Sequence, residues 1–183
     1  MKLSTLLKSN LGMNYDKAVH LEPHNPLWAQ AYAEIQDGFA GLFKGLNYHI
    51  AHVGSTALPI MAKPILDIAL TPELSLADVP FRQRLVNTDL NIENGNAFIV
   101  IKDDQDRNLC HIHTSYKGNT EKLLFKKFLL EHPNALSAYE SLKKENAELH
   151  PKIHNYSRNK TEFVTGIVAQ AERLYDKNEL ISF

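Results

Sequence analysis

The segment covering residues 52–70 constrains the fold of this chain more than any other part of the sequence. An apolar strand ends at Val53, three small residues follow as a tight turn, and a short connection leads into a second apolar strand. The connection carries Lys63, and Asp67 projects from the second strand. The segment therefore predicts two strands with polar chemistry at the turn between them.

The turn has the composition of a phosphate-binding loop. Small residues let backbone N–H groups and hydroxyls approach an anion closely, and a nearby lysine adds a point charge suited to phosphate. The sequence therefore predicts phosphate contacts from Gly54, Ser55, Thr56 and Lys63.

Alternation along the second strand decides where its carboxylate points. The strand has one apolar face and one less apolar face, formed by Leu66, Ile68 and Leu70 and by Ile65, Asp67 and Ala69, respectively. Asp67 is then open to a ligand while the opposite face packs on helices. The alternative is a structural acid that pairs with Lys63 or caps a turn.

The spacing from the turn to Asp67 resembles the pattern of nucleotidyltransferases. In that pattern a Gly-Ser turn holds a triphosphate, and two carboxylates one residue apart on a strand hold Mg²⁺. Ala69 stands here at the second carboxylate position. The resemblance implies that Asp67 is the catalytic acid.

A closer resemblance is to the GrpB family. The runs His-Val-Gly-Ser-Thr-Ala-Leu-Pro at residues 52–59 and Lys-Pro-Ile-Leu-Asp at residues 63–67 are similar to the typical core of that family. Members of the family also occur fused to dephospho-CoA kinases. The resemblance, which covers about residues 20–175, implies a nucleotide or a CoA-like phosphate compound as the ligand.

A later strand, predicted at residues 109–116, carries the second chemical feature. Alternation places His111 and His113 on one face, where two imidazoles can share a metal ion or donate to a phosphate when protonated. Two hydrogen-bonded structural histidines are the alternative. GrpB-like chains usually carry His-x-His on this strand, so the resemblance favours a functional site.

Asp67, His111 and His113 converge if their strands lie side by side in one antiparallel sheet. Such a cluster would stand where a nucleotidyltransferase keeps its carboxylates. Imidazole ligands shift the preference from Mg²⁺ toward Mn²⁺ and transition metals such as Zn²⁺ or Ni²⁺. We therefore expect these three residues to hold a divalent metal ion.

Composition limits the partners of the chain. Its 183 residues are 44% hydrophobic, enough for the core of one domain, and 20 basic against 21 acidic residues give no global field to attract nucleic acid or an anionic membrane. The single cysteine, Cys110, fits a reducing compartment, so we expect a cytoplasmic protein. No segment approaches the roughly 18 apolar residues of a membrane span.

The remaining elements follow from apolar periodicity and from cap residues. After Asn25 and Pro26 a helix is predicted, followed by a helix at residues 75–87, strands near residues 90–92 and 97–101, and three helices that begin near residues 120, 134 and 155–157. The expected fold is an α/β (α+β) domain with a small mixed or antiparallel sheet of the nucleotidyltransferase type, flanked by helices mainly from the C-terminal half. Residues 1–19 are expected to form a loosely docked tail before a single GrpB-like domain at residues 20–183.

Two lysines of the C-terminal half extend the predicted phosphate site. Lys126 and Lys160 match basic positions of the GrpB pattern and lie near predicted helix starts, so the resemblance implies that both bind phosphate. A solvated surface position is the alternative for each.

Two functions follow from these motifs. The first is metal-dependent nucleotidyl transfer, in which the metal held by Asp67 and the histidines neutralises charge and the turn with Lys63 holds the departing phosphates. The second is a non-catalytic module that binds a nucleotide or CoA.

Overall fold

The computed structural model describes residues 5–72, 84, 88, 91–94, 98–114, 119–176 and 180. In chain order its elements are α1 (Thr5–Asn10), α2 (Leu27–Leu42), β1 (Tyr48–Val53), the 3₁₀ turn η1 (Ser55–Ala57), β2 (Leu66–Pro72), β3 (Asn91–Asn94), β4 (Phe98–Lys102), β5 (Asn108–Thr114), α4 (Thr120–Glu131), α5 (Pro133–Leu149), α6 (Ile153–Arg158) and α7 (Thr161–Leu174). This confirms the predicted α/β class. The helix predicted at residues 75–87 lies outside the described residues except for Arg84.

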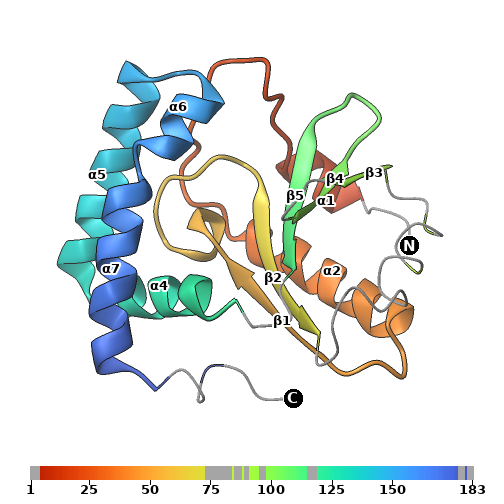
Figure 1. The fold of residues 1–183 in the computed structure, drawn as a ribbon. Coiled ribbons are helices and arrows are strands. Elements are labelled where there is room, and N and C mark those ends of the chain that lie inside the picture. Colours follow the sequence, from red (N-terminus) through yellow and green to blue (C-terminus); the bar gives the residue numbers. More distant parts are fainter. Residues whose placement is uncertain are drawn as a thin grey trace.

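The strands form one mixed sheet in the order β1-β2-β5-β4-β3. β2 pairs with β5 in parallel, whereas the other neighbours are antiparallel. Of the two predicted alternatives, a mixed or an antiparallel sheet, the mixed sheet is thus confirmed. The strands of Asp67 and of the two histidines are neighbours (Figure 1), but they run parallel and not antiparallel. Because β2 and β5 are parallel, the chain must return to the end of the sheet where β2 begins before it enters β5.

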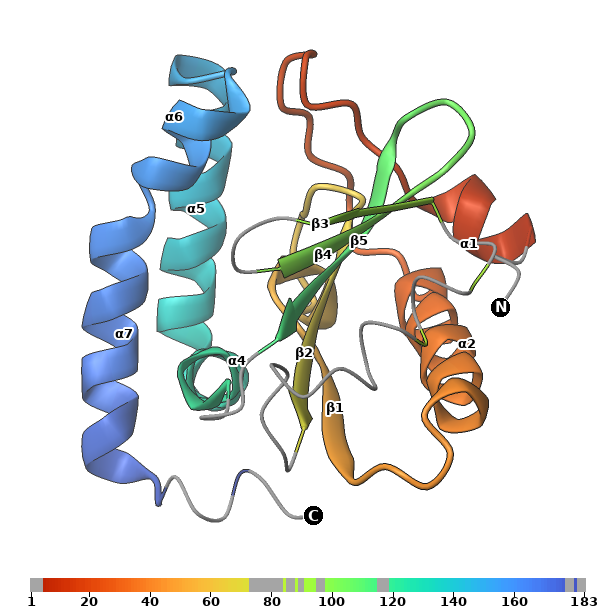
Figure 2. The ribbon, with the colours of Figure 1, turned by 45° about the vertical axis from the view of Figure 1, so that its right-hand side comes forward.

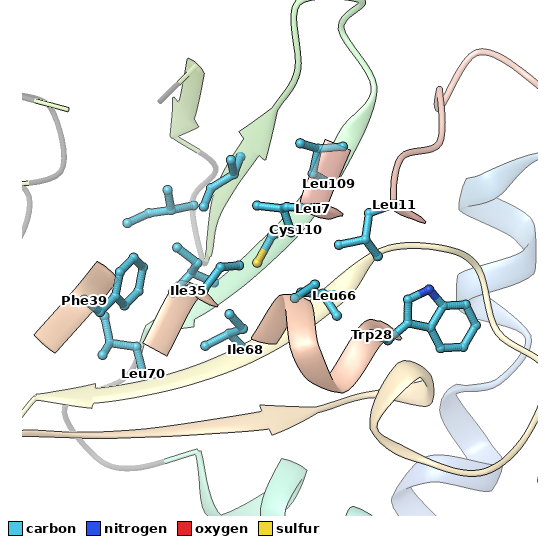
Figure 3. Packing of buried hydrophobic residues seen from close by; sticks show 14 of the residues in the cluster. Leu7, Leu11, Trp28, Ile35, Phe39, Leu66, Ile68, Leu70, Leu109 and Cys110 are labelled. Carbon is cyan, nitrogen blue, oxygen red and sulfur yellow. The ribbon is translucent and has the colours of Figure 1, made fainter. Parts of the chain in front are cut away.

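Helices cover both faces of the sheet. Figure 2 shows α1 and α2 on one side and α4, α5, α6 and α7 on the other. The apolar side chains of α2, which recur every three or four residues, pack against the apolar face of β2 (Figure 3). This core contains Trp28, Ala31, Ile35, Phe39, Leu66, Ile68 and Leu70, each at most 1% exposed. The opposite face of β2 carries Asp67 and does not pack against α2.

The N-terminal segment belongs to this core. Leu7 and Leu11 are 1% and 2% exposed and pack with α2, and the indole N–H of Trp28 donates to the carbonyl of Asn10 at 3.2 Å. Met13 forms an isolated bridge with Asn108, the first residue of β5. Residues 5–13 are therefore docked more firmly than expected, because a helix of six residues is too short for its leucine spacing to indicate which surface it covers.

Truncation of Leu7 tests this anchoring. We expect Leu7→Ala to lower the free energy of unfolding by about 2 to 5 kcal/mol, because it removes a buried side chain from the core. Urea unfolding followed by the fluorescence of Trp28, the one tryptophan, measures the change. The exposed neighbour Lys8→Ala is the control and should stay within about 0.5 kcal/mol of wild type. Equal stability of the two variants would contradict the anchoring.

The C-terminal half is helical, as expected, with one difference. The third predicted helix is two helices, α6 and α7, because the chain leaves the helical path between Arg158 and Thr161. Leu149 and Leu174, the last residues of α5 and α7, are 64% and 61% exposed, although the apolar spacing of their helices predicts that they face inward. Among the described helices, none has the length and apolar character that a bilayer crossing requires.

Candidate functional site

The register of β2 and β5 brings Asp67 together with both histidines. Asp67 lies opposite His111 in the parallel ladder. Its Oδ1 is 2.9 Å from Nε2 of His113 and 3.4 Å from Nδ1 of His111. The predicted convergence of the three side chains is thus present. The Asp67 side chain remains 31% exposed, so the cluster is accessible from outside.

Electrostatics keep this carboxylate ionised. Burial alone would raise the pKa of Asp67, but hydrogen bonds and electrostatic interactions with His111 and His113 hold that pKa well below its usual value. An ionised carboxylate can only accept hydrogen bonds, so Nε2 of His113 carries the proton in their contact. The acid pairs with histidines of the neighbouring strand, not with Lys63 as in the structural alternative.

Tyr15 completes the cluster, and the sequence did not single it out. Its hydroxyl lies 2.8 Å from Nε2 of His111, on the side of the ring opposite Asp67. Burial, and then the charge of Asp67, raise the pKa of Tyr15, so the phenol stays protonated and can donate to the imidazole. Tyr15 sits in a loop without a periodic pattern, so no local signal marked it.

Gly54 fits closely against Asp67. It has φ +71° and ψ −170°, a backbone conformation that is almost restricted to glycine. A Cβ at this position would lie 2.4 Å from Oδ2 of Asp67. The turn therefore brings the backbone directly beside the carboxylate. The hydroxyl of Ser55 lies 3.3 Å from that of Tyr139 on α5.

Two lysines meet at one tyrosine ring. The ammonium groups of Lys63 and Lys160 lie 5.4 and 4.1 Å from the centroid of Tyr156. Burial lowers the pKa of both, that of Lys160 to about 7, and the positive charge of Lys63 contributes to the effect on Lys160. The Tyr-x-x-x-Lys spacing of residues 156–160 was visible in the sequence, but its partner Lys63 lies far away along the chain.

Both lysines line a cavity of about 450 Å³, which we call the lysine cavity. Its wall also contains Tyr15, Gly54, Ser55, Ile65, Asp67, His111, Tyr139, Ile153, His154, Tyr156 and Ser157. The structure thus brings together six of the predicted residues, namely Gly54, Ser55, Lys63, Asp67, His111 and Lys160. His113 faces a neighbouring cavity.

Two predicted phosphate ligands lie elsewhere. Thr56 is 2% exposed, and its hydroxyl bonds Nε2 of His52 at 2.9 Å and donates to the carbonyl of Ile65 at 3.4 Å. Lys126 donates to the carbonyl of His52 at 2.9 Å, which ties α4 to the end of β1. Both side chains hold the turn in place and do not line the lysine cavity.

Two residues of α5 hold the connection that carries Lys63. Oε1 of Glu140 accepts from the N–H of Met61 at 2.9 Å, and the fully buried Lys143 donates to the carbonyl of the same residue. Burial, and then the charge of Lys160, lower the pKa of Lys143 to about 7. Sequence reasoning missed both contacts, because the spacing of α5 says nothing about which loop it meets.

The Asp67 cluster contains the three side chains predicted to hold a metal ion. Both histidines direct a nitrogen at the same oxygen, Oδ1 of Asp67, so the three side chains form a hydrogen-bonded cluster. Within the described part of the chain no three histidine, cysteine or acidic side chains are arranged to hold a metal ion. The divalent metal at Asp67, His111 and His113 therefore stays a prediction.

The fold and the site define an α/β protein in which Gly54 and Ser55 of the turn and two half-buried lysines face one cavity beside an Asp-His-His cluster. The chain belongs to the GrpB family, because the profile described as GrpB protein matches residues 18–170.

Known proteins similar to this chain agree with that assignment. The UPF0157 protein YqkA of Bacillus subtilis is 27% identical over 92% of this chain, which spans only 51% of that longer protein. The glutamate-rich protein GrpB of Alkalihalophilus pseudofirmus is 30% identical, with coverage of 86% of this chain and 98% of the relative. The crystal structure of the conserved protein GrpB from Enterococcus faecalis has the same fold, with a TM-score of 0.69 at 23% identity over 85% of this chain and 99% of that chain.

Proposed function

We propose that the chain binds a small molecule that carries a phosphate, such as a nucleotide or a CoA-like compound, in the lysine cavity. One observation carries the proposal. Lys63 and Lys160 share the ring of Tyr156, and neither forms an ion pair with a carboxylate in the part of the chain that the structure describes.

Two neighbouring half-buried cations are costly without an anion. Burial lowers the pKa of both amines, and the charge of Lys63 lowers that of Lys160 further. The carboxylate of Asp67 acts in the opposite direction on both, but it is hydrogen-bonded to the histidines, so among the described residues the two amines have no anionic partner of their own. A bound phosphate supplies that partner through charge-assisted hydrogen bonds. The close approach of the backbone at Gly54 and the hydroxyl of Ser55 add donors at the same cavity.

Titration with inorganic phosphate, pyrophosphate and ATP, by calorimetry, tests the proposal. We expect saturable binding to wild type and a loss of about 10- to 100-fold in affinity for Lys160→Met, because a hydrogen bond to a charged group disappears. Lys152→Met is the matched control, since Lys152 is exposed and does not line the lysine cavity. If none of the three anions binds, or if both variants bind like wild type, the proposal fails.

Nucleotidyl transfer is a second candidate for the same site, favoured by the ionised and accessible carboxylate of Asp67 at the cavity wall. A divalent ion would supply charge neutralisation at the transferring phosphorus. The chain contributes the hydrogen-bonded Asp67 and the cationic wall, which would hold the departing phosphates.

A metal titration separates transfer from binding alone. If the predicted site exists, Mn²⁺ or Zn²⁺ binds wild type in calorimetry, and Asp67→Asn weakens that binding at least about tenfold, because an anionic ligand is lost. A label-transfer screen with radioactive nucleotides then reports turnover. Wild type that binds nucleotide but neither metal ion would support the non-catalytic binding module instead.

A further inference from the structure

A second cavity adjoins the lysine cavity. It has a volume of about 430 Å³ and also reaches Gly54, Asp67 and Tyr139, which line both spaces. We call it the apolar cavity, because Val53, Phe125, Val164 and Val168 supply much of its wall. The two cavities therefore meet at the Asp67 carboxylate.

The net charges of the acidic and basic side chains that line the two cavities differ in sign. Lys63 and Lys160 face the lysine cavity, whereas Glu121, Lys122 and Glu172 line the apolar cavity together with its hydrophobic side chains. A phosphate is therefore attracted to the lysine cavity, and a second anionic group is disfavoured in the apolar cavity. This asymmetry fixes the direction in which an elongated ligand lies.

The boundary between the cavities offers a hydrogen-bond acceptor. Both histidine contacts of Asp67 go to Oδ1, whereas Oδ2 lies beside Gly54 and accepts no hydrogen bond from a described residue. An ionised carboxylate repels phosphate but accepts strongly from hydroxyl groups. The part of a ligand that crosses Asp67 should therefore carry hydroxyls.

We propose that the ligand is a phosphate ester whose organic part has hydroxyl groups next to the phosphate and an uncharged apolar ring beyond them, the composition of a nucleoside monophosphate. The phosphate occupies the lysine cavity, the hydroxyls meet Asp67, and the ring occupies the apolar cavity. This assignment rests on the proposed phosphate binding and names its ligand class.

Three probes measured by calorimetry separate the parts of this ligand: inorganic phosphate, ribose 5-phosphate and adenosine monophosphate. We expect affinity to rise in that order, with adenosine monophosphate about tenfold or more tighter than ribose 5-phosphate, because burial of the ring adds apolar contact. Equal affinity of all three would overturn the ligand class and leave phosphate binding intact. If no probe binds, the proposed function fails, and the ligand class fails with it.

A blocking variant tests the location of the ring. Ala169 is an exposed residue of α7 on the wall of the apolar cavity, so Ala169→Phe fills that space without entering the core. It should abolish the advantage of adenosine monophosphate over ribose 5-phosphate and leave inorganic phosphate affinity unchanged. Gln170→Phe, on the same helix but not at this cavity, is the matched control and should preserve the order. Unchanged adenosine monophosphate affinity in Ala169→Phe would overturn the proposal.

Discussion

Gly54→Ala is expected to destabilise the protein by about 3 kcal/mol or more, because backbone strain and a steric clash act together. The backbone of Gly54 lies in a region that is almost closed to other residues, at φ +71° and ψ −170°. The added Cβ would lie 2.4 Å from Oδ2 and 2.7 Å from Cβ of Asp67. Neither atom can easily move away. The Cβ is fixed by the backbone of β2, and the carboxylate is held by its histidine contacts. Urea unfolding followed by Trp28 fluorescence measures the change.

Gly41→Ala is the matched control for this substitution. Gly41 lies inside α2, and a Cβ there would meet nothing within 4 Å. Alanine is the better helix former, so this variant should gain about 0.5 to 1 kcal/mol. A Gly54→Ala protein within about 1 kcal/mol of wild type would show that the turn does not press against Asp67 as described, since strain alone should cost more.

The second large effect concerns Lys143 and appears as a dependence of stability on pH. The pKa of this buried amine is lowered from 10.5 to about 7 in the folded protein. Between these values the unfolded chain binds a proton that the folded chain does not. The stability that Lys143 contributes is therefore complete above pH 10.5 and is lost as pH falls toward 7.

Lys143→Met removes this dependence together with the hydrogen bond to Met61. At about pH 9 the wild type should be the more stable protein by about 1 kcal/mol or more, because its amine satisfies the Met61 carbonyl. Its advantage should shrink by about 1 kcal/mol for each pH unit toward neutrality and then vanish or reverse. Below pH 9 the buried Cys110 and the tyrosines do not oppose the trend, because the raised pKa values of these groups act at higher pH.

Urea unfolding at several pH values between about 6.5 and 9 measures this difference. Lys144→Met is the control, because the neighbouring Lys144 is 49% exposed and pairs with Glu140 at the surface. Its curve should run parallel to that of wild type. Parallel curves for wild type and Lys143→Met would contradict the lowered pKa of Lys143.

Local pattern was enough to predict most elements of the fold. The alternation of β2 placed Asp67 on the face opposite the α2 core, and the His-x-His alternation of β5 placed both histidines toward it. At the start of α2, Asn25 Oδ1 accepts from the N–H of Leu27 at 3.0 Å, as its cap chemistry predicted. These properties depend on neighbours along the chain, which a sequence displays directly.

Partners that are distant along the chain were harder to predict. Thr56 and Lys126 matched a phosphate pattern, yet both bond to His52 and support the turn. Tyr15 and Lys143 were not predicted as site residues, yet the first contacts His111 and the second holds the connection that carries Lys63. Residue type indicates which hydrogen bonds a side chain can make, but only packing decides which partner it finds.

By itself, the sequence determined the α/β class, the Gly-Ser-Thr turn after a strand, the direction of Asp67 and the membership in the GrpB family. Strand alternation, turn chemistry and motif spacing are short-range properties, so they could be predicted before any folding. The tertiary structure alone decided that β2 and β5 run parallel, that the N-terminal segment joins the core, and that Lys63 and Lys160 meet at Tyr156. Those outcomes depend on how segments that are distant along the chain pack against one another. The residue pattern within one segment does not specify which other segment it will contact.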